Sequence, residues 1–374
     1  MMEQKRLGDI ATYINGFSFK PEDRSTVGLP IIRIQDLTGN TYDLGFYDGS
    51  YPKRIEINDG DVLISWSASL GIYVWNRGKA LLNQHIFKVA FDKCDVNREF
   101  FVYAVRHKLK EMESKTHGAT MKHIVKKDFD NTLIPFPTLN EQGKIAKLLD
   151  TVDTIISARQ QQLQKLDELV KARFVEMFGD PIANEKEWEV TELNLACDGI
   201  GDGLHGTPEY DENGEYPFIN GNNLMNGIIE ITPTTKMVNE TTYKKHYIEL
   251  SRNAILLSIN GTLGKLAFYN GEKVMLGKSA CYCNLKSDFN REFVYGVMKT
   301  DTFMDFLENN ATASTIKNVG LKAIRGFKLI MPPEELQTQF VEFANQVDKS
   351  KVAVQKALDE AQLLFDSLMQ QYFG

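Results

Sequence analysis

Apolar residues recur at alternating steps of four and three along one stretch in the middle of the chain. Its seam positions are Ile145, Leu149, Val152, Ile156, Arg159, Leu163, Leu166, Val170, Arg173 and Met177. This heptad spacing predicts one long helix with an apolar seam. A Thr138-x-x-Glu141 capping box opens the helix, and Gly179-Asp180-Pro181 ends it. Because a lone helix with such a seam is unstable in water, the sequence must also supply a partner helix.

The partner helix is predicted at the C-terminus. An offset of 195 carries the seam onto Phe340, Ala344, Val347, Lys351, Val354, Leu358, Ala361, Phe365, Leu368 and Tyr372. The same offset carries Gln142 onto Gln337, and both helices follow a proline-marked entry. The chain is therefore predicted to be a tandem duplication. The residues expected to hold the helix pair together are Ile145, Leu149, Val152, Ile156, Leu163, Leu166, Val170, Phe340, Val347, Val354, Leu358, Phe365 and Leu368.

The two blocks that precede these helices follow one plan. Residues 30–35 and 62–66 read as strands in the first block, and residues 217–224 and 254–261 match them in the second. Asn97-Arg98-Glu99-Phe100 recurs letter for letter as Asn290-Arg291-Glu292-Phe293. We therefore predict an α+β fold: two globular mixed α/β domains separated by two long antiparallel coiled-coil helices, with a pseudo-twofold internal repeat.

The composition is that of a soluble, multidomain protein. The chain has 374 residues, of which 43% are hydrophobic, so a sizeable core can form. No apolar stretch reaches the roughly 18 residues of a membrane-spanning helix, and no signal-peptide core follows the N-terminus. We expect a cytoplasmic protein without a membrane partner. Cys281-x-Cys283 has no second ligand pair nearby, so no zinc site is predicted. A disulfide framework is not expected in a chain of this size.

The net charge of −7 hides an uneven distribution. Residues 1–136 carry 19 Lys and Arg against 17 Asp and Glu, whereas residues 180–331 carry 15 against 20. A negative total does not exclude DNA binding, because a local basic face is what releases counterions. It does indicate that basic partner proteins supply further phosphate contacts.

Motifs of catalysis are missing from the sequence. It contains no Gly-x-Ser-x-Gly, Gly-Lys-Ser/Thr, His-Glu-x-x-His or Asn-Pro-Pro-Tyr/Phe motif. Residues 201–206 fit Gly-x-Gly-x-x-Gly, but Thr207-Pro208 blocks the helix that a dinucleotide site needs. Cys197-Asp198-Gly199 is also a poor strand, so a loop without cofactor is the favoured interpretation. We predict no catalytic residue, cofactor site or metal site, although carboxylates distant in sequence could still pair in space.

Polar and basic loops remain as candidates for binding. The densest basic stretch holds Lys115, His117, Thr120, Lys122, His123, Lys126 and Lys127, and the second block places Ser314, Thr315, Lys317 and Asn318 at the matching offset. A solvated surface and contact with phosphates or bases are equal alternatives for these residues. The amides of Gln35, Asn222 and Asn223 can pair with adenine edges, while turn capping explains them equally well.

Several of these residues together resemble the specificity subunit of a type I restriction–modification system. They are Pro137-Thr138-Leu139-Asn140-Glu141-Gln142, Met177-Phe178-Gly179-Asp180-Pro181 with Asn184 and Trp188, and Pro332-Pro333 with Gln337. The resemblance covers the whole chain. It implies target-recognition domain 1 at 1–136, a central conserved helix at 137–179, target-recognition domain 2 at 180–331 and a C-terminal conserved helix at 332–374. Glu334-Glu335-Leu336 departs from the family pattern at the second helix entry.

The resemblance also implies a function. A subunit of this family reads a bipartite double-stranded DNA target and holds no active site. Two methyltransferase subunits bring S-adenosylmethionine and methylate adenine, and restriction subunits bring ATP and Mg. Two other hypotheses stay open from the residues alone. One is a coiled-coil interaction scaffold without DNA binding, which salt-dependent DNA binding would exclude. The other is a DNA-processing enzyme, which activity of the purified chain would support.

Overall fold

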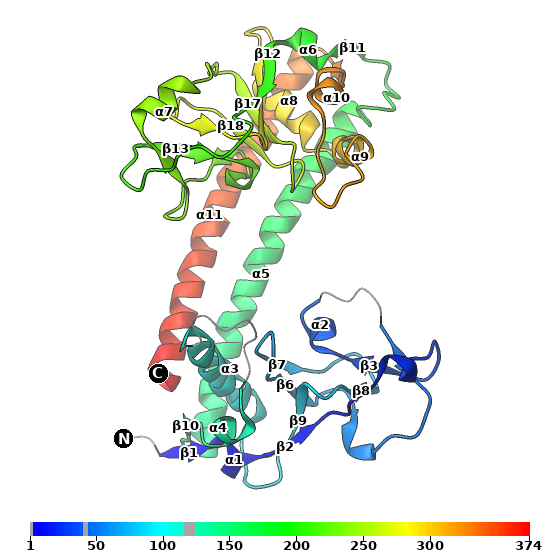
Figure 1. Ribbon diagram of the computed structural model, residues 1–374, viewed down its shortest axis with the longest axis vertical. Helices are drawn as coiled ribbons and strands as arrows, with labels where there is room; N and C mark the ends of the chain where they lie inside the picture. Colours follow the sequence, from blue (N-terminus) through cyan, green and yellow to red (C-terminus); the bar gives the residue numbers. More distant parts are fainter. Residues whose placement is uncertain (1–2, 40–43, 116–123) are drawn as a thin grey trace. The chain divides into compact units, whose positions relative to one another are not determined.

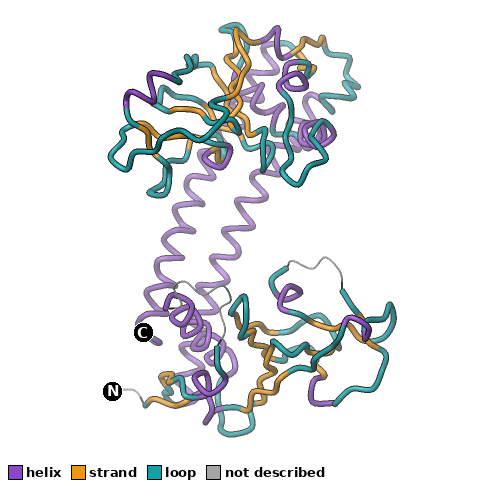
Figure 2. The backbone as a smooth tube through the Cα atoms, viewed as in Figure 1, coloured by secondary structure: helices purple, strands orange, loops and turns teal. Residues whose placement is uncertain are grey.

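The computed structural model describes residues 3–39, 44–115 and 124–374. The chain forms two compact units, labelled by element in Figure 1. Unit 1 contains residues 1–160 and 356–374, and unit 2 contains residues 161–355. Two helices contribute to both units, α5 (Leu139–Phe178) and α11 (Glu334–Phe373). In each unit, strands and helices are joined by long loops (Figure 2), which confirms the predicted α+β class.

Unit 1 is built on two four-stranded sheets. The first is antiparallel and has the order β2 (Thr12–Asn15), β9 (Ile86–Ala90), β6 (Val62–Ser65) and β7 (Gly71–Val74). The second has the order β4 (Phe46–Tyr47), β3 (Leu29–Ile32), β8 (Ala80–Leu82) and β5 (Glu56–Ile57), with β3 and β8 parallel. The remaining elements are β1 (Gln4–Arg6) paired with β10 (Leu133–Pro135), α1 (Leu7–Ile10), η1 (Pro21–Asp23), α2 (Ile34–Leu37), η2 (Lys53–Ile55), α3 (Arg98–Lys115) and α4 (Lys126–Asp130).

Unit 2 repeats this arrangement. Its antiparallel sheet has the order β12 (Cys197–Asp202), β20 (Ala280–Leu285), β17 (Ala254–Ser258) and β18 (Leu266–Phe268). A second sheet has the order β16 (Met237–Val238), β13 (Tyr216–Ile219) and β19 (Met275–Leu276), with β13 and β19 parallel. The remaining elements are β11 (Glu189–Glu192) paired with β21 (Lys328–Met331), α6 (Leu193–Ala196), η3 (Gly221–Asn223), β14 (Leu224–Met225) paired with β15 (Ile228–Ile229), α7 (Glu240–Lys245), α8 (Arg291–Met298), α9 (Asp301–Asn309) and α10 (Leu321–Arg325).

Parts of the helix seam lie in the cores of the two units. In unit 1, the early part of α5 packs with the end of α11 in one apolar cluster, so the two segments run antiparallel. In unit 2, the end of α5 packs with the start of α11 in the same sense. All thirteen residues expected to hold the pair together are buried or half-buried. They are Ile145, Leu149, Val152, Ile156, Leu358, Phe365 and Leu368 in unit 1, and Leu163, Leu166, Val170, Phe340, Val347 and Val354 in unit 2.

The caps of α5 have the geometry that the sequence predicts. Thr138 N donates to Glu141 Oε2 at 3.0 Å, and Glu141 N donates to Thr138 Oγ1 at 3.4 Å. The hydroxyl of Thr138 also donates to Glu141, and these bonds lower the pKa of the Glu141 carboxyl. At the other end, Gly179 takes the left-handed conformation, with φ of +74°. No described helix is long and apolar enough to cross a membrane.

Three sequence-based expectations need correction. Residues 30–35 are not one strand, because β3 ends at Ile32 and Asp36 caps a helical turn that contains Gln35. Residues 217–224 are not one strand either, because β13 ends at Ile219 and residues 221–223 form the 3₁₀ turn η3. Residues 197–199 do form a strand, since they open β12, where a register shift between Cys197 and Gly199 accommodates the irregular sequence.

Candidate nucleic-acid interface

In unit 2, the chain makes a polar turn where β13 ends. Asn220 N donates to Asn223 Oδ1 at 3.0 Å, and Asn223 Nδ2 donates to the carbonyl of Glu230 at 3.0 Å. The Asn223 amide is therefore engaged on both sides, by the backbone of the turn and by the carbonyl of Glu230 just after β15, as the capping interpretation predicts. Asn222, one residue earlier, is exposed. Of the two amides, Asn222 is the one available to an incoming base.

Ser279 connects this turn to the neighbouring sheet. Its hydroxyl donates to Asn220 Oδ1 at 3.0 Å and accepts from Gly221 N at 2.9 Å. Its carbonyl accepts from Ile259 N at 3.1 Å, just after β17. The end of β13, the end of β17 and the start of β20 are thus tied together, and their polar residues share one edge of unit 2.

The loop after α9 joins the same edge. Asn260 Nδ2 donates to Asn318 Oδ1 at 3.0 Å, and Gly261 N donates to the carbonyl of Lys317 at 2.9 Å. Ser314 and Thr315 are exposed on this loop, and the Lys317 ammonium pairs with Glu308. The structure therefore brings together Asn222, Asn223, Ser314, Thr315, Lys317 and Asn318, which the sequence places in two distant segments.

Unit 1 holds an equivalent turn with different side chains. Arg33 N donates to Asp36 Oδ2 at 2.8 Å, as Asn220 N does to Asn223 in unit 2. Gln35 is half-buried at the position that matches Asn222. Two guanidinium groups flank the turn. Arg33 Nε lies 3.3 Å from Asp36 Oδ2, and Arg77 Nη2 donates to the Asp36 carbonyl at 2.7 Å while its guanidinium stacks over the Trp75 ring.

The basic stretch of the first block is largely outside the described residues. This holds for His117, Thr120, Lys122 and His123, and the side chain of Lys115 is not described either. The stretch leads into Ile124, whose N–H donates to the carbonyl of Trp66 at 3.0 Å. Val319 N donates to the carbonyl of Ile259 at 2.9 Å at the matching place in unit 2. The backbone that follows both loops is therefore held in the same way.

The Gly-x-Gly-x-x-Gly segment is explained by packing. Its first two residues end strand β12, contrary to expectation, but no helix follows the segment. A Cβ on Gly203 would lie 2.0 Å from the carbonyl oxygen of Leu276, and a Cβ on Gly16 in unit 1 would lie 2.1 Å from that of Asn83. Both units thus need glycine where the chain crosses the end of a strand.

Comparison with known proteins shows the family to which the chain belongs. A family model described as "Type I restriction modification DNA specificity domain" matches residues 1–168 and 185–361. The chain belongs to this family. It is 22% identical to the type I restriction enzyme EcoBI specificity subunit of Escherichia coli, over 97% of this chain and 83% of that protein. It is 21% identical to the MjaVIII specificity subunit of Methanocaldococcus jannaschii, over 82% of this chain and 78% of that protein.

Solved structures of specificity subunits share the fold. The S subunit of a type I system from M. genitalium aligns with a TM-score of 0.54 at 15% identity, covering 100% of this chain and 96% of that one. A chain from a structural study of type I complex assembly and conformational transition aligns with a TM-score of 0.57 at 18% identity, covering 99% and 97%. Both comparisons support the two-unit α+β architecture of this family member.

Several residues of the interface were missed by sequence reasoning. They are Asn220, Ser279 and Asn260 in unit 2, and Arg33 and Arg77 in unit 1. Arg33 and Asn220 each stand directly after a strand and three residues before a capping side chain, so their common spacing could have revealed them. The roles of Ser279 and Arg77 depend on contacts across 59 and 41 residues, for which the sequence carries no local signal.

Proposed function

We propose that this specificity subunit reads a bipartite double-stranded DNA target, one half through each unit. The observation that carries the proposal is the pair of equivalent turns after β3 and β13. Both are closed by the same backbone-to-side-chain bond, yet one presents Arg33, Gln35 and Arg77 and the other presents Asn220 and Asn222. Arginine suits the acceptors of guanine, and Asn or Gln suits adenine, so two different sequences would be read.

The loops beside these turns would hold the phosphate backbone. Lys317 and the hydroxyls of Ser314 and Thr315 are exposed next to the reading turn of unit 2. Phosphate contacts fix the position of a protein on DNA, whereas base contacts specify the sequence. In this proposal the loop 311–318 sets the register, and Asn222, on the turn that Asn220 and Ser279 hold in place, supplies the discrimination. The segment containing Lys122 has the corresponding place in the sequence of unit 1.

Catalysis would belong to partner subunits. We propose that two methyltransferase subunits bring S-adenosylmethionine and methylate adenine, that restriction subunits bring ATP and Mg, and that the complex works in the cytoplasm. The family membership and the absence of catalytic motifs from the sequence support a non-catalytic role for this chain. Membership of a family described as a DNA specificity domain also favours this proposal over a coiled-coil interaction scaffold that does not bind DNA.

Methylation mapping tests the proposal directly. The chain would be expressed with its methyltransferase subunits, and the methylated adenines would be mapped for the parent, Gln35→Ala and Asn222→Ala. Each substitution should relax one half of the target, by about 1–3 kcal/mol of discrimination at the affected base pair, and leave the other half unchanged. Glu212→Ala, at an exposed residue outside both turns, is the control. Relaxation of both halves by one substitution would contradict a division of reading between the units.

A further inference from the structure

In the internal repeat, Tyr103 of unit 1 and Gly296 of unit 2 occupy equivalent positions. The matching motifs that begin at Asn97 and Asn290 set this alignment. The packing agrees with it, because Phe100 contacts Phe373 with ring centroids 5.3 Å apart, and Phe293 contacts Phe178 at 5.1 Å. One unit therefore carries a phenol ring where the other carries no side chain.

In unit 1, the Tyr103 ring fills a site between α3, α5 and α11. Its hydroxyl donates to Asp150 Oδ1 at 2.7 Å, and its ring centroid lies 6.0 Å from that of Phe365. The guanidinium of Arg106 lies 5.2 Å from the ring centroid. Burial and the bond to Asp150 raise the pKa of Tyr103, so the phenol stays protonated and donates. A hydrogen-bond acceptor, an apolar wall and a cation together hold the ring.

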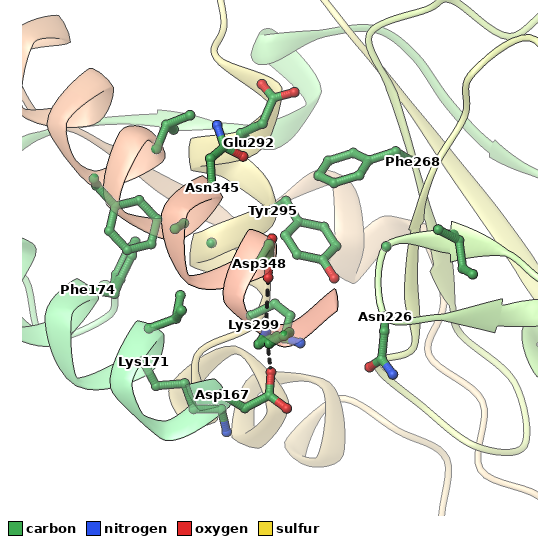
Figure 3. Close-up of a pocket in the computed structure, with 18 of the residues that line it drawn as sticks. Asp167, Lys171, Phe174, Asn226, Phe268, Glu292, Tyr295, Lys299, Asn345 and Asp348 are labelled. Carbon is green, nitrogen blue, oxygen red and sulfur yellow. Dashed lines mark hydrogen bonds and ion pairs between the residues drawn. The ribbon is translucent and has the colours of Figure 1, made fainter. Parts of the chain in front are cut away.

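In unit 2, the equivalents of these neighbours line a cavity of about 600 Å³. Asn345 corresponds to Asp150, Asp348 to Asp153, Val170 to Phe365 and Lys299 to Arg106, and all four line the cavity. Figure 3 labels Asn345, Asp348 and Lys299. Phe340 covers the backbone at Gly296, since a Cβ there would lie 2.7 Å from its ring. Phe340 thus takes the inner part of the site, and the outer part stays open.

Within the described residues, Lys171 and Lys351 of the cavity lining are paired with carboxylates, and the ammonium of Lys299 is left for a ligand. Lys351 Nζ pairs with Asp167 at 2.7 Å and with Asp348 at 3.1 Å. The dashed lines in Figure 3 start at these two labelled carboxylates. Lys299 Nζ makes no hydrogen bond or ion pair within the described part of the chain, and it lies 5.8 Å from the Tyr295 ring centroid. Burial lowers the pKa of Lys299. The Lys299 ammonium could make a cation–π contact with a second aromatic ring, as the Arg106 guanidinium does with Tyr103 in unit 1.

The rim of the cavity indicates a ligand larger than one ring. Ile228 and Val352 both line the cavity, yet their side chains are 59% and 71% exposed. Apolar side chains around a pocket are typical of a protein interface in which one aromatic anchor fills the pocket and neighbouring contacts exclude water. A free small phenol would leave this rim uncovered.

We propose that the cavity of unit 2 is a receptor for a tyrosine side chain of a protein partner, which takes the place that Tyr103 fills in unit 1. Its hydroxyl donates to Asn345, its ring lies beside Val170 and Lys299, and its backbone covers Ile228 and Val352. Neither Asn220 nor Asn222 lines this cavity, although its lining residues Asn226 and Ile228 follow the reading turn in the chain. The receptor therefore goes beyond the proposed function. It would also make the two halves of the repeat unequal toward partners.

The test measures binding of p-cresol and N-acetyltyrosinamide to the full chain by ligand-observed NMR. Both probes should bind one site, with Kd of about a millimolar for a ligand of this size. N-acetylphenylalaninamide should bind about fivefold more weakly, because it cannot make the hydroxyl bond. Asn345→Asp restores the acceptor of unit 1 and should tighten p-cresol binding about three- to tenfold. Lys299→Met should weaken it about two- to fivefold.

Two further variants serve as controls. Lys349 is an exposed residue of α11, the helix that carries Asn345, and it does not line the cavity. Lys349→Met should therefore leave p-cresol binding unchanged. Tyr103→Ala should open a second p-cresol site, in unit 1. Failure of p-cresol to bind the parent, or equal binding by Asn345→Asp and the parent, would overturn the receptor. If p-cresol bound but N-acetyltyrosinamide did not, the cavity would not be a receptor for a tyrosine of a protein partner. None of these outcomes depends on DNA binding, so they leave the proposed function to its own test.

Discussion

Gln142 and Gln337 make the same hydrogen bond at the starts of the two long helices. Each side-chain Nε2 donates to the carbonyl of the proline five residues earlier, at 2.9 Å for Gln142 and 2.8 Å for Gln337. Both side chains are buried, with 1% and 8% exposed. Gln142 Oε1 also accepts from Asn97 N at 2.9 Å, so it ties the start of α5 to the start of α3.

This relationship predicts unequal losses of stability. Gln142→Ala leaves the carbonyl of Pro137 and the N–H of Asn97 without their partner, at a cost of at most roughly 1–3 kcal/mol for each of these half-buried groups. Gln337→Ala leaves the carbonyl of Pro332 and should cost about half as much. Urea unfolding of the two variants measures the difference. Gln161→Ala, at an exposed site on α5, should change stability by less than about 0.5 kcal/mol. Equal losses for Gln142→Ala and Gln337→Ala would show that the Asn97 contact contributes nothing.

The capping box of α5 predicts an acid-sensitive contribution to stability. The folded-state pKa of Glu141 is lowered by its bonds to Thr138, so this stability is present above the unfolded-state pKa, near 4.5, and is lost as pH falls through the folded-state value. Thr138→Ala should therefore destabilise the protein at pH 7 more than at pH 3. Thr138→Ser keeps the hydroxyl and should restore the parent behaviour. Thermal unfolding across this pH range is the measurement, and a Thr138→Ala deficit that does not vary with pH would contradict the link to Glu141.

Two matched glycines provide a prediction for each unit. Alanine at Gly16 or Gly203 places a Cβ about 2 Å from a backbone carbonyl oxygen, which cannot move as a flexible side chain would. Each substitution should cost roughly 1–3 kcal/mol or more, as overpacking does. Gly143→Ala in α5 meets nothing within 4 Å and should stabilise by about 0.5–1 kcal/mol instead. Differential scanning calorimetry of the three variants would show whether the close approach, rather than glycine flexibility alone, is what both units require.

The helices and the repeat were predictable because their signals are local or periodic. The seam from Ile145 onward has a fixed spacing. The capping box joins Thr138 and Glu141, which are only three residues apart in the sequence. The strand at residues 197–202 was missed for the opposite reason. Gly201 pairs across the sheet with Tyr282, whose ring lies over it, with Oη 2.7 Å from the position of a Cβ. An aromatic ring on the neighbouring strand can compensate for a strand glycine, and local propensity cannot show this.

The candidate interface was predictable only in part. Asn222 and the loop containing Ser314 were selected from residue type and from the repeat. Their meeting at one edge depends on Ser279, which reaches Asn220 across 59 residues, and on Asn260, which reaches Asn318 across 58. Such long-range contacts follow from the sheet order, and a single sequence does not encode that order in any local pattern.

The ion pair of Lys317 with Glu308 gives the last prediction, which concerns the DNA-reading edge. If Lys317 contacts phosphate, it must leave Glu308 when DNA binds, because one ammonium cannot fully serve both partners. Lys317→Ala should weaken DNA binding across all sequences and lower the salt slope by about one. Glu308→Gln removes the competing carboxylate and should strengthen binding about two- to fivefold, within the range of an exposed ion pair.

Equilibrium binding at several salt concentrations measures both effects. Lys328→Ala, at an exposed residue of β21, is the matched control and should leave the slope unchanged. A Lys317→Ala variant that keeps the parent slope but changes base preference would assign this residue to base readout instead. The Glu308→Gln result separates these two roles further. Releasing a phosphate-binding lysine raises affinity for every sequence alike, whereas releasing a base-reading lysine raises affinity for the cognate target alone.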